Sequence, residues 1–115
     1  MASISVFSAA DRQFEAYLGD ASTPEKGGAR IARLVGRPNS SSLGGGVVVY
    51  ERLTVDWNLD FDEMITVIEG GMNIHSGGAT YAVVAGDVAW FPAHTPLTYE
   101  VADRVVVSYA IWPMP

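Results

Sequence analysis

The sequence predicts an all-β domain, a sandwich or a small barrel of short strands. Runs rich in Val, Ile, Tyr, Trp and Thr recur along the chain, with turn residues between them at intervals of roughly ten residues, the spacing typical of such folds. The 115 residues are enough for one domain, and an apolar content of 49% allows a substantial core. The prediction is therefore a single barrel-like domain.

The first expected element is a helix. The segment SAADRQFEAYLG (8–19) predicts one helix of about three turns, with Ser8 as its N-cap and Gly19 as its terminator. We divide the chain into an N-terminal arm, residues 1–28, that contains this helix, and a barrel, residues 29–115. Within the barrel, the glycine- and serine-rich stretch 36–46 is expected to be a loop.

Strand-forming segments fill the rest of the barrel. Gly70-Gly71 and Gly77-Gly78 are expected to form tight hairpin turns between strands, because glycine readily adopts the positive φ that such turns need. Ala102-Asp103 is predicted to be a further short turn. The expected strands are 29–35, 45–55, 63–69, 72–76, 80–85, 87–92, 97–101 and 104–112.

Alternation along the strands predicts which way side chains face. Asp62 and Glu63 are adjacent and must point to opposite faces, whereas Tyr50 and Arg52 share parity and should face the same way. In 104–112, the side chains on both faces of the expected strand are mostly apolar. Strands covered on both faces fit a small barrel whose outer wall packs on a second layer or a second subunit, so we expect a homodimer.

Composition restricts the partners and the location. The net charge is −6 with only one lysine, which argues against nucleic acid and anionic membranes as partners, because both require clustered positive charge. The chain has no cysteine, hence no disulfide and no thiolate nucleophile. No stretch approaches the roughly 18 apolar residues needed to span a bilayer, and the N-terminus lacks the pattern of a secretory signal. We expect a cytoplasmic protein.

Two segments resemble the conserved motifs of the cupins, small β-barrels of two antiparallel sheets with a jelly-roll-like arrangement. The first cupin motif ends in Glu, six residues and Gly, which here are Glu63 and Gly70 in FDEMITVIEGGMNI. The second begins with Gly, five residues and Pro, which here are Gly86 and Pro92 in AGDVAWFPAHTPLTYEV, with Asp87 after the glycine as usual. The resemblance implies a small cupin barrel.

The resemblance can be narrowed to the cupin domain of EutQ-type ethanolamine utilisation proteins. It implies a role in ethanolamine or related small-amine catabolism, and the family is associated with bacterial microcompartments and with phosphoryl transfer between ATP and acetate. The sequence has no phosphate-binding loop ending in Gly-Lys-Ser/Thr, so we do not expect kinase activity to carry over intact. The residues that carry this resemblance are Trp57, Leu59, Phe61, Asp62, Glu63, Glu69 and Gly70.

The metal ligands of typical cupins are missing. Such cupins bind a divalent ion through three histidines and one glutamate, and the corresponding histidine positions, within 56–59 and at Leu97, hold other residues. The chain contains two histidines, too few for a three-histidine site within one chain. We therefore expect no metal cofactor. The alternative is a two-histidine, one-carboxylate site built from His75, His94 and Glu63; otherwise His75 is a hydrogen-bonded strand histidine and His94 a rim residue.

Glu63 is the strongest catalytic candidate. A carboxylate at an inward barrel position needs a partner, and Arg52 or a tyrosine hydroxyl would serve; if it is poorly compensated its pKa should rise, which suits general acid/base work. The neighbouring acids Asp56, Asp60 and Glu69 are expected to be solvated or structural. Candidates for ligand binding at the barrel mouth are Tyr50, Arg52, Trp57, Trp90, His94 and Tyr99.

Three functions remain open at this point. The first is a cupin without the three-histidine metal site that binds or acts on a small molecule in its barrel, in ethanolamine or related catabolism. The second is a non-catalytic barrel that binds or senses a small molecule. The third is a two-histidine, one-carboxylate metal enzyme acting on a small carboxylate.

Overall fold

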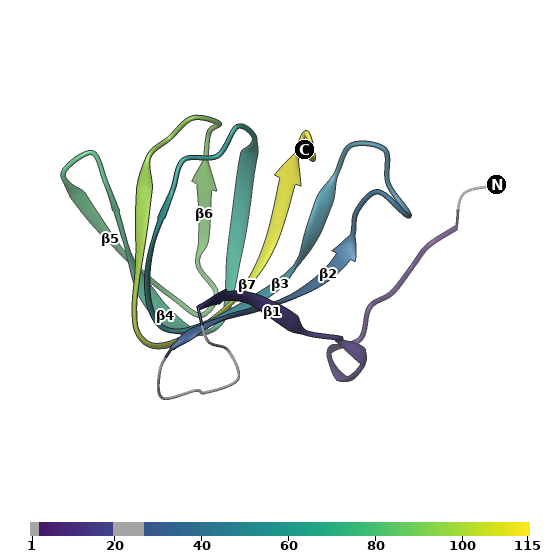
Figure 1. Cartoon of the computed structure of the whole chain (residues 1–115), viewed down its shortest axis with the longest axis horizontal. Coiled ribbons are helices and arrows are strands. Elements are labelled where there is room, and N and C mark those ends of the chain that lie inside the picture. Colours follow the sequence, from purple (N-terminus) through teal and green to yellow (C-terminus); the bar gives the residue numbers. More distant parts are fainter. Residues whose placement is uncertain (1–2, 20–26) are drawn as a thin grey trace.

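Three long antiparallel strands, each strongly bent, form the centre of the fold (Figure 1). They are β3 (Gly44–Trp57), β4 (Asp62–Ser76) and β7 (Leu97–Trp112), with β7 paired between the other two. The structure is a computed structural model and describes residues 3–19 and 27–115.

Four shorter strands extend this central group on both sides. β2 (Gly28–Val35) pairs with β3, and β1 (Glu15–Gly19) pairs with β2. β5 (Ala79–Val84) pairs with β4, giving the order β1-β2-β3-β7-β4-β5, and β6 (Val88–Phe91) pairs with the first part of β4. All of these pairs are antiparallel, which confirms the all-β prediction.

The bends of the three long strands occur at one level of the sheet. The register between β3 and β7 shifts between Glu51 and Leu53, and that between β4 and β7 shifts between Gly70 and Asn73. Arg52 and Gly70 have φ values of 44° and 71° at these two irregularities. Because bulges bend strands and increase their twist, the connected sheet folds back on itself into two facing layers, as Figure 1 shows.

One apolar core lies between the two layers. Residues before and after each bend contribute to it, for example Tyr50 and Val55 of β3 and Val67 and Ile74 of β4. Tyr99 of β7 is almost completely buried there. A second, smaller cluster on the outer side consists of Val47, Val49 and Val106 with Leu34 packed against it. The arrangement is the small cupin barrel that the motifs implied.

The expected N-terminal helix is wrong. A single 3-10 turn, Ala9–Asp11, is the only helical element in residues 3–19 and 27–115, and the end of the predicted helix is strand β1. Ser8 does not cap the backbone; its hydroxyl donates to the Asp11 carboxylate at 2.7 Å. Pairing with β2 supplies hydrogen bonds that outweigh a weak local preference for helix. No helix in these residues is long and apolar enough to cross a membrane.

Two of the three predicted turns are also wrong. Gly77-Gly78 does join β4 to β5, with positive φ at both residues. Gly70-Gly71 instead lies inside β4, and Ala102-Asp103 lies inside β7, where the bent strands continue without a break. The division of the chain at residue 29 stays a prediction, although β1 on its N-terminal side pairs with the barrel.

Gly70 is expected to be far more sensitive to substitution than Gly77. A Cβ at Gly70 would lie 2.1 Å from the carbonyl oxygen of Arg104, whereas a Cβ at Gly77 would meet nothing within 4 Å. Both residues have positive φ, so Gly77→Ala should lose about 1–2 kcal/mol of unfolding free energy from backbone strain alone. Gly70→Ala should lose a further ~1–3 kcal/mol because β7 must move. Denaturant unfolding of both variants measures the difference; equal losses would contradict the role given to Gly70.

Candidate functional site

A cavity of about 540 Å³ lies inside the barrel and opens at one end. Apolar and aromatic side chains from β1, β2, β3, β4 and β7 form most of its wall. The loop residues 36–39 and the C-terminal residues Met114 and Pro115 also line it. The cavity is a concave, largely apolar space of the size that small ligands occupy.

Aromatic rings centred on Tyr99 form one region of this interior. Tyr99 lies edge-on to Tyr50, with ring centroids 5.4 Å apart, and edge-on to Trp57 at 6.4 Å. Phe91 lies 6.2 Å from Tyr99, and Tyr17 of β1 stacks on Trp57 at 6.2 Å. Such edge-to-face and stacked pairs hold one another in place, so this part of the wall is rigid.

Glu63 lies near the start of β4 and lines the same cavity. Burial raises the pKa of its carboxyl from 4.5 to about 7. Among the described residues, no hydrogen bond or ion pair involves the Glu63 side chain. It therefore occupies the barrel without a compensating partner from that part of the chain.

The tyrosine hydroxyls share this space with Glu63. Burial raises the pKa of Tyr99 well above its ordinary value, and the nearby Glu63 carboxylate raises it further. The pKa of Tyr17 is raised by the same two causes, in the same order. Tyr50 and Tyr109, which also line the cavity, have raised pKa values because of burial first. At neutral pH all four hydroxyls remain protonated and able to donate hydrogen bonds.

Two arginines line the cavity, Arg33 of β2 and Arg37 of the loop that follows it, and both are exposed. Arg33 of β2 lines the cavity and forms an ion pair with Glu15 of β1, and its guanidinium lies 5.8 Å from the centre of the Tyr17 ring. Arg33 lowers the pKa of Tyr17, but burial alone accounts for the raised pKa of Glu63. The Arg33 guanidinium, which is paired with Glu15, forms no ion pair with the Glu63 carboxyl.

Four of the predicted site residues meet in the cavity, namely Tyr50, Trp57, Glu63 and Tyr99. Arg52 does not: its Nη1 lies 3.7 Å from Asp103 on the outside of the barrel. The expectation that Tyr50 and Arg52 face the same way is wrong because the bulge at Arg52 reverses the alternation. Arg52 is consequently not the partner of Glu63.

Trp90 and His94 also lie outside the cavity. Trp90 is 58% exposed on the outer face of β6, opposite Met64 of β4. His94 lies in the rim loop after β6. Its backbone N–H donates to the Leu59 carbonyl at 2.8 Å, and its ring Nδ1 is 3.5 Å from the Asp60 carboxylate. Its φ of 65° is a left-handed backbone conformation that residues other than glycine rarely adopt.

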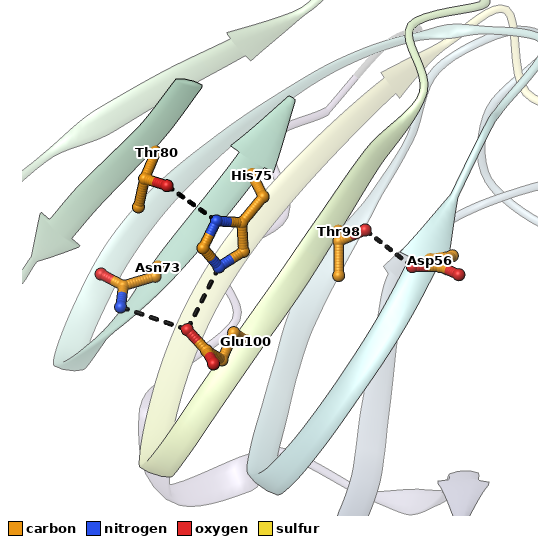
Figure 2. A network of polar contacts seen from close by, with 6 residues as sticks. All are labelled: Asp56, Asn73, His75, Thr80, Thr98 and Glu100. Carbon is orange, nitrogen blue, oxygen red and sulfur yellow. Dashed lines mark hydrogen bonds and ion pairs between the residues drawn. The ribbon is translucent and has the colours of Figure 1, made fainter. Parts of the chain in front are cut away.

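His75 is held in a polar network on the outer face of the second half of β4 (Figure 2). Its Nδ1 is 2.8 Å from the Thr80 hydroxyl and its Nε2 is 3.1 Å from the Glu100 carboxylate. A neutral imidazole with the proton on Nε2 satisfies both contacts, because Thr80 can donate to Nδ1. Hydrogen bonds from His75 and Asn73 lower the pKa of Glu100. His75 is thus a hydrogen-bonded strand histidine.

The alternative metal site is not formed. His75 lies on the outer face, His94 on the rim and Glu63 in the interior, so the three cannot share one ion. Within residues 3–19 and 27–115, no group of three or more His, Cys, Asp or Glu side chains is placed to hold a metal. These residues do not fit the metal centre of typical cupins.

The acidic residues around Glu63 have separate structural partners. Asp62 points away from Glu63 and accepts a hydrogen bond from the backbone of Ala93 at 2.9 Å. Asp56 accepts a hydrogen bond from Thr98 at 2.6 Å on the outer face (Figure 2). The remaining contacts are Glu69 with Arg104 at 2.7 Å and Asp87 with the backbone of Val84 at 2.9 Å.

Sequence reasoning missed three residues that contribute to the cavity. Tyr17 was placed on a helix and so could not be assigned to the barrel wall. Arg33 shares parity with the buried Ile31 in β2, and applying alternation to that strand would have identified it as an inward residue. Tyr109 was noted as a strand residue but not selected, although it lies on the inward parity of β7.

The chain is similar to known ethanolamine utilisation proteins. Acetate kinase EutQ of Escherichia coli (strain K12) is 30% identical over 83 residues, which are 72% of this chain and 36% of that protein. Acetate kinase EutQ of Clostridioides difficile (strain 630) is 28% identical over 74 residues, 64% of this chain and 47% of that protein. The chain thus spans between about a third and a half of the length of these curated relatives.

Solved structures and a family model agree with this similarity. The structure of the Clostridium difficile EutQ protein has a TM-score of 0.72 and 25% identity, covering 92% of this chain and 79% of that one. An RmlC-like cupin from Shewanella frigidimarina shows the same fold, with a TM-score of 0.76, 16% identity and coverage of 97% and 93%. The model of the family described as ethanolamine utilisation protein EutQ matches residues 4–115. The chain belongs to the EutQ family of cupins.

Proposed function

We propose that this protein binds a small organic molecule in its barrel cavity and that Glu63 holds or moves a proton there. The observation that carries the proposal is the composition of the wall. Glu63 is the one acidic residue among the described residues that line the cavity, and four tyrosines, Tyr17, Tyr50, Tyr99 and Tyr109, line the same space. A ligand in this space would meet one carboxyl, several hydroxyls and aromatic surface.

The chemistry follows from the pKa of Glu63. With a pKa of about 7, the carboxyl is present in both protonation states near neutral pH, so it can act as a general acid or a general base. The hydroxyls of Tyr50 and Tyr99 are available to orient the ligand. The proposed site does not use the three-histidine centre of other cupins, because the chain has two histidines.

Membership of the EutQ family supports a role for this proposed site in ethanolamine utilisation or related small-amine catabolism. The curated relatives bear the name acetate kinase, but the chain covers 36% and 47% of the two compared above. Phosphoryl transfer is not part of the proposal, because the sequence contains no Gly-Lys-Ser/Thr phosphate loop. The cytoplasmic location and the absence of nucleic-acid partners stay predictions.

The second candidate function is a non-catalytic binding or sensing barrel. The rigid aromatic group around Tyr99 favours it, because a preorganised wall supports binding whether or not a reaction follows. Glu63→Gln separates the two functions. If the wild type converts a bound compound and the variant converts it equally well, Glu63 is not the acid/base group.

We also propose a homodimer, on a surface that differs from the one expected. The outward residue Val106 of β7 is already buried within the chain. Exposed apolar side chains instead lie together on the first half of β4 and its neighbours, where Met64 is opposite Trp90 and Trp112 is opposite Asp62. Cross-strand neighbours point to the same face, so these three form one outward patch. Exposed aromatic residues of this kind are enriched in interfaces.

Occupancy of the cavity is measurable through the tryptophans. Trp57 lines the cavity, whereas Trp90 and Trp112 lie on the outside. In ¹H–¹⁵N NMR spectra, titration with small neutral, anionic and cationic fragments should shift the Trp57 indole signal and leave the other two in place. If no fragment shifts Trp57 selectively, the cavity is not a binding site.

Glu63 is expected to lower the free energy of unfolding as the pH rises. In the unfolded chain its carboxyl ionises near 4.5, while in the folded chain it keeps its proton up to about pH 7. Between these values the folded state binds more protons, so the free energy of unfolding should fall by about 3 kcal/mol from pH 4.5 to 7. Denaturant unfolding across this range should show the fall.

Two variants test the assignment of this pH dependence. Glu63→Gln has no carboxyl to ionise, so the decrease in unfolding free energy that Glu63 causes between pH 4.5 and 7 should disappear. The variant should then be more stable than the wild type at pH 8. Glu69→Gln removes an exposed carboxyl that pairs with Arg104 and should leave the fall unchanged. A fall that persists in Glu63→Gln would show that another group causes it.

The dimer is tested by placing a charge in the outward patch. Trp90→Glu should shift the protein toward a 12.3 kDa monomer in sedimentation velocity, because a buried interface does not tolerate an unpaired charge. Tyr81→Glu is the control, since Tyr81 is 57% exposed, nearly as much as Trp90 at 58%, but lies on β5 outside the patch. A wild type that sediments as a monomer would refute the proposal.

A further inference from the structure

The charges inside the barrel are unbalanced. Glu63 contributes a buried carboxyl that has no cation beside it in the described part of the chain. A buried carboxylate without a partner is unfavourable, and a positively charged ligand would remove that penalty. The two arginines that line the cavity, Arg33 and Arg37, are exposed and form no ion pair with this carboxyl, so no positive charge of the described residues balances it.

Groups on each neighbouring element contribute to the surroundings of this carboxyl. Tyr17 of β1, Tyr50 of β3 and Tyr109 of β7 carry hydroxyls that stay protonated at neutral pH. Two charged groups lie on the remaining side: Arg33 of β2, which is paired with Glu15, and Arg37 of the loop that follows β2. Glu63 is the only one of these groups that ionises near neutral pH.

The aromatic rings of the wall add a second feature that favours a cation. The face of an aromatic ring is negative, and a cation within about 6 Å of the ring centre is attracted to it. Tyr50, Trp57 and Tyr99 form a contiguous group of rings in the same cavity as Glu63. Tyr17 already has a cation, Arg33, near its ring. An aromatic wall combined with one carboxylate is the arrangement that recognises organic ammonium ions.

We propose that the ligand of the barrel is a small organic ammonium ion, whose charged nitrogen pairs with the Glu63 carboxylate and whose carbon atoms contact the rings of Trp57 and Tyr99. This inference rests on the proposed function, because it assigns a ligand class to the same cavity. The volume of about 540 Å³ admits primary and quaternary amines of a few carbon atoms.

Binding of such a cation depends on pH through Glu63. Only the ionised carboxyl attracts the ammonium group, so affinity should increase as the pH rises through about 7. A carboxyl that is about one-tenth ionised at pH 6 and nine-tenths ionised at pH 8 gives an affinity roughly tenfold weaker at pH 6. A neutral ligand of the same shape should not show this increase.

Matched pairs of probes isolate the contribution of the positive charge. Choline and 3,3-dimethyl-1-butanol have the same shape, and so do ethanolamine and 1-propanol, but only the first of each pair carries an ammonium group. We would titrate each into the full chain at pH 6 and pH 8 and follow the Trp57 indole by NMR. At pH 8, at least one ammonium probe should bind tenfold or more tightly than its neutral partner. Acetate should bind no better than the neutral probes.

Variants link the binding to named side chains. Glu63→Gln should remove the preference for the ammonium probe and its pH dependence, while Glu69→Gln should retain both, since Glu69 lies outside the cavity. Trp57→Leu lacks the indole reporter, so its binding is measured by isothermal titration calorimetry. It should bind the ammonium probe severalfold more weakly with the pH dependence intact, because it removes aromatic surface but not the carboxylate. Tyr99 is a poor choice for this test because its burial makes the fold depend on it.

The outcomes separate this inference from the proposed function. If neutral probes or acetate bind in the cavity as well as the ammonium probes do, the cavity is a binding site but the ammonium inference is overturned. Loss of ammonium preference in Glu69→Gln as well as Glu63→Gln would also overturn it. If none of the probes, nor the wider fragment set, shifts Trp57 selectively, the proposed function fails together with the inference.

Discussion

The bulges that bend the three long strands are the constraint on which the rest of the structure depends. Without them β3, β4 and β7 would form an extended sheet with one buried face at most. The positive φ of Gly70 and the close approach of Arg104 at that point allow β4 to bend without a break. The two halves of each strand then face one another, and the space between them becomes both the core and the cavity.

The same bend separates two kinds of polar chemistry. Outside, acids and histidine are paired with neighbours on adjacent strands and stay in contact with water, as in the His75–Glu100 network. Inside, Glu63 has been removed from most of its water and has aromatic neighbours instead. A carboxyl of the same chemical type therefore has opposite shifts of pKa in the two places, lowered at Glu100 and raised at Glu63.

The sequence predicted local features well and features that depend on the bend poorly. Strand periods, the Gly77-Gly78 turn and the opposite directions of Asp62 and Glu63 follow from rules that act over a few residues. Arg52 was misplaced because alternation was extended across a bulge, and no pattern of residue types announces a bulge at a non-glycine position. The segment at Tyr17 was assigned to a helix because its pairing with β2 depends on residues more than ten positions away.

The C-terminal residues lie where a ligand would enter and leave the cavity. Met114 and Pro115 line the opening of the cavity, and the N–H of Met114 donates to the Ser42 carbonyl in the loop that follows β2. In the proposed function, this rim lies on the path by which a ligand enters and leaves the cavity. A bulky group beside Met114 would therefore narrow the opening and slow exchange of the proposed ligand.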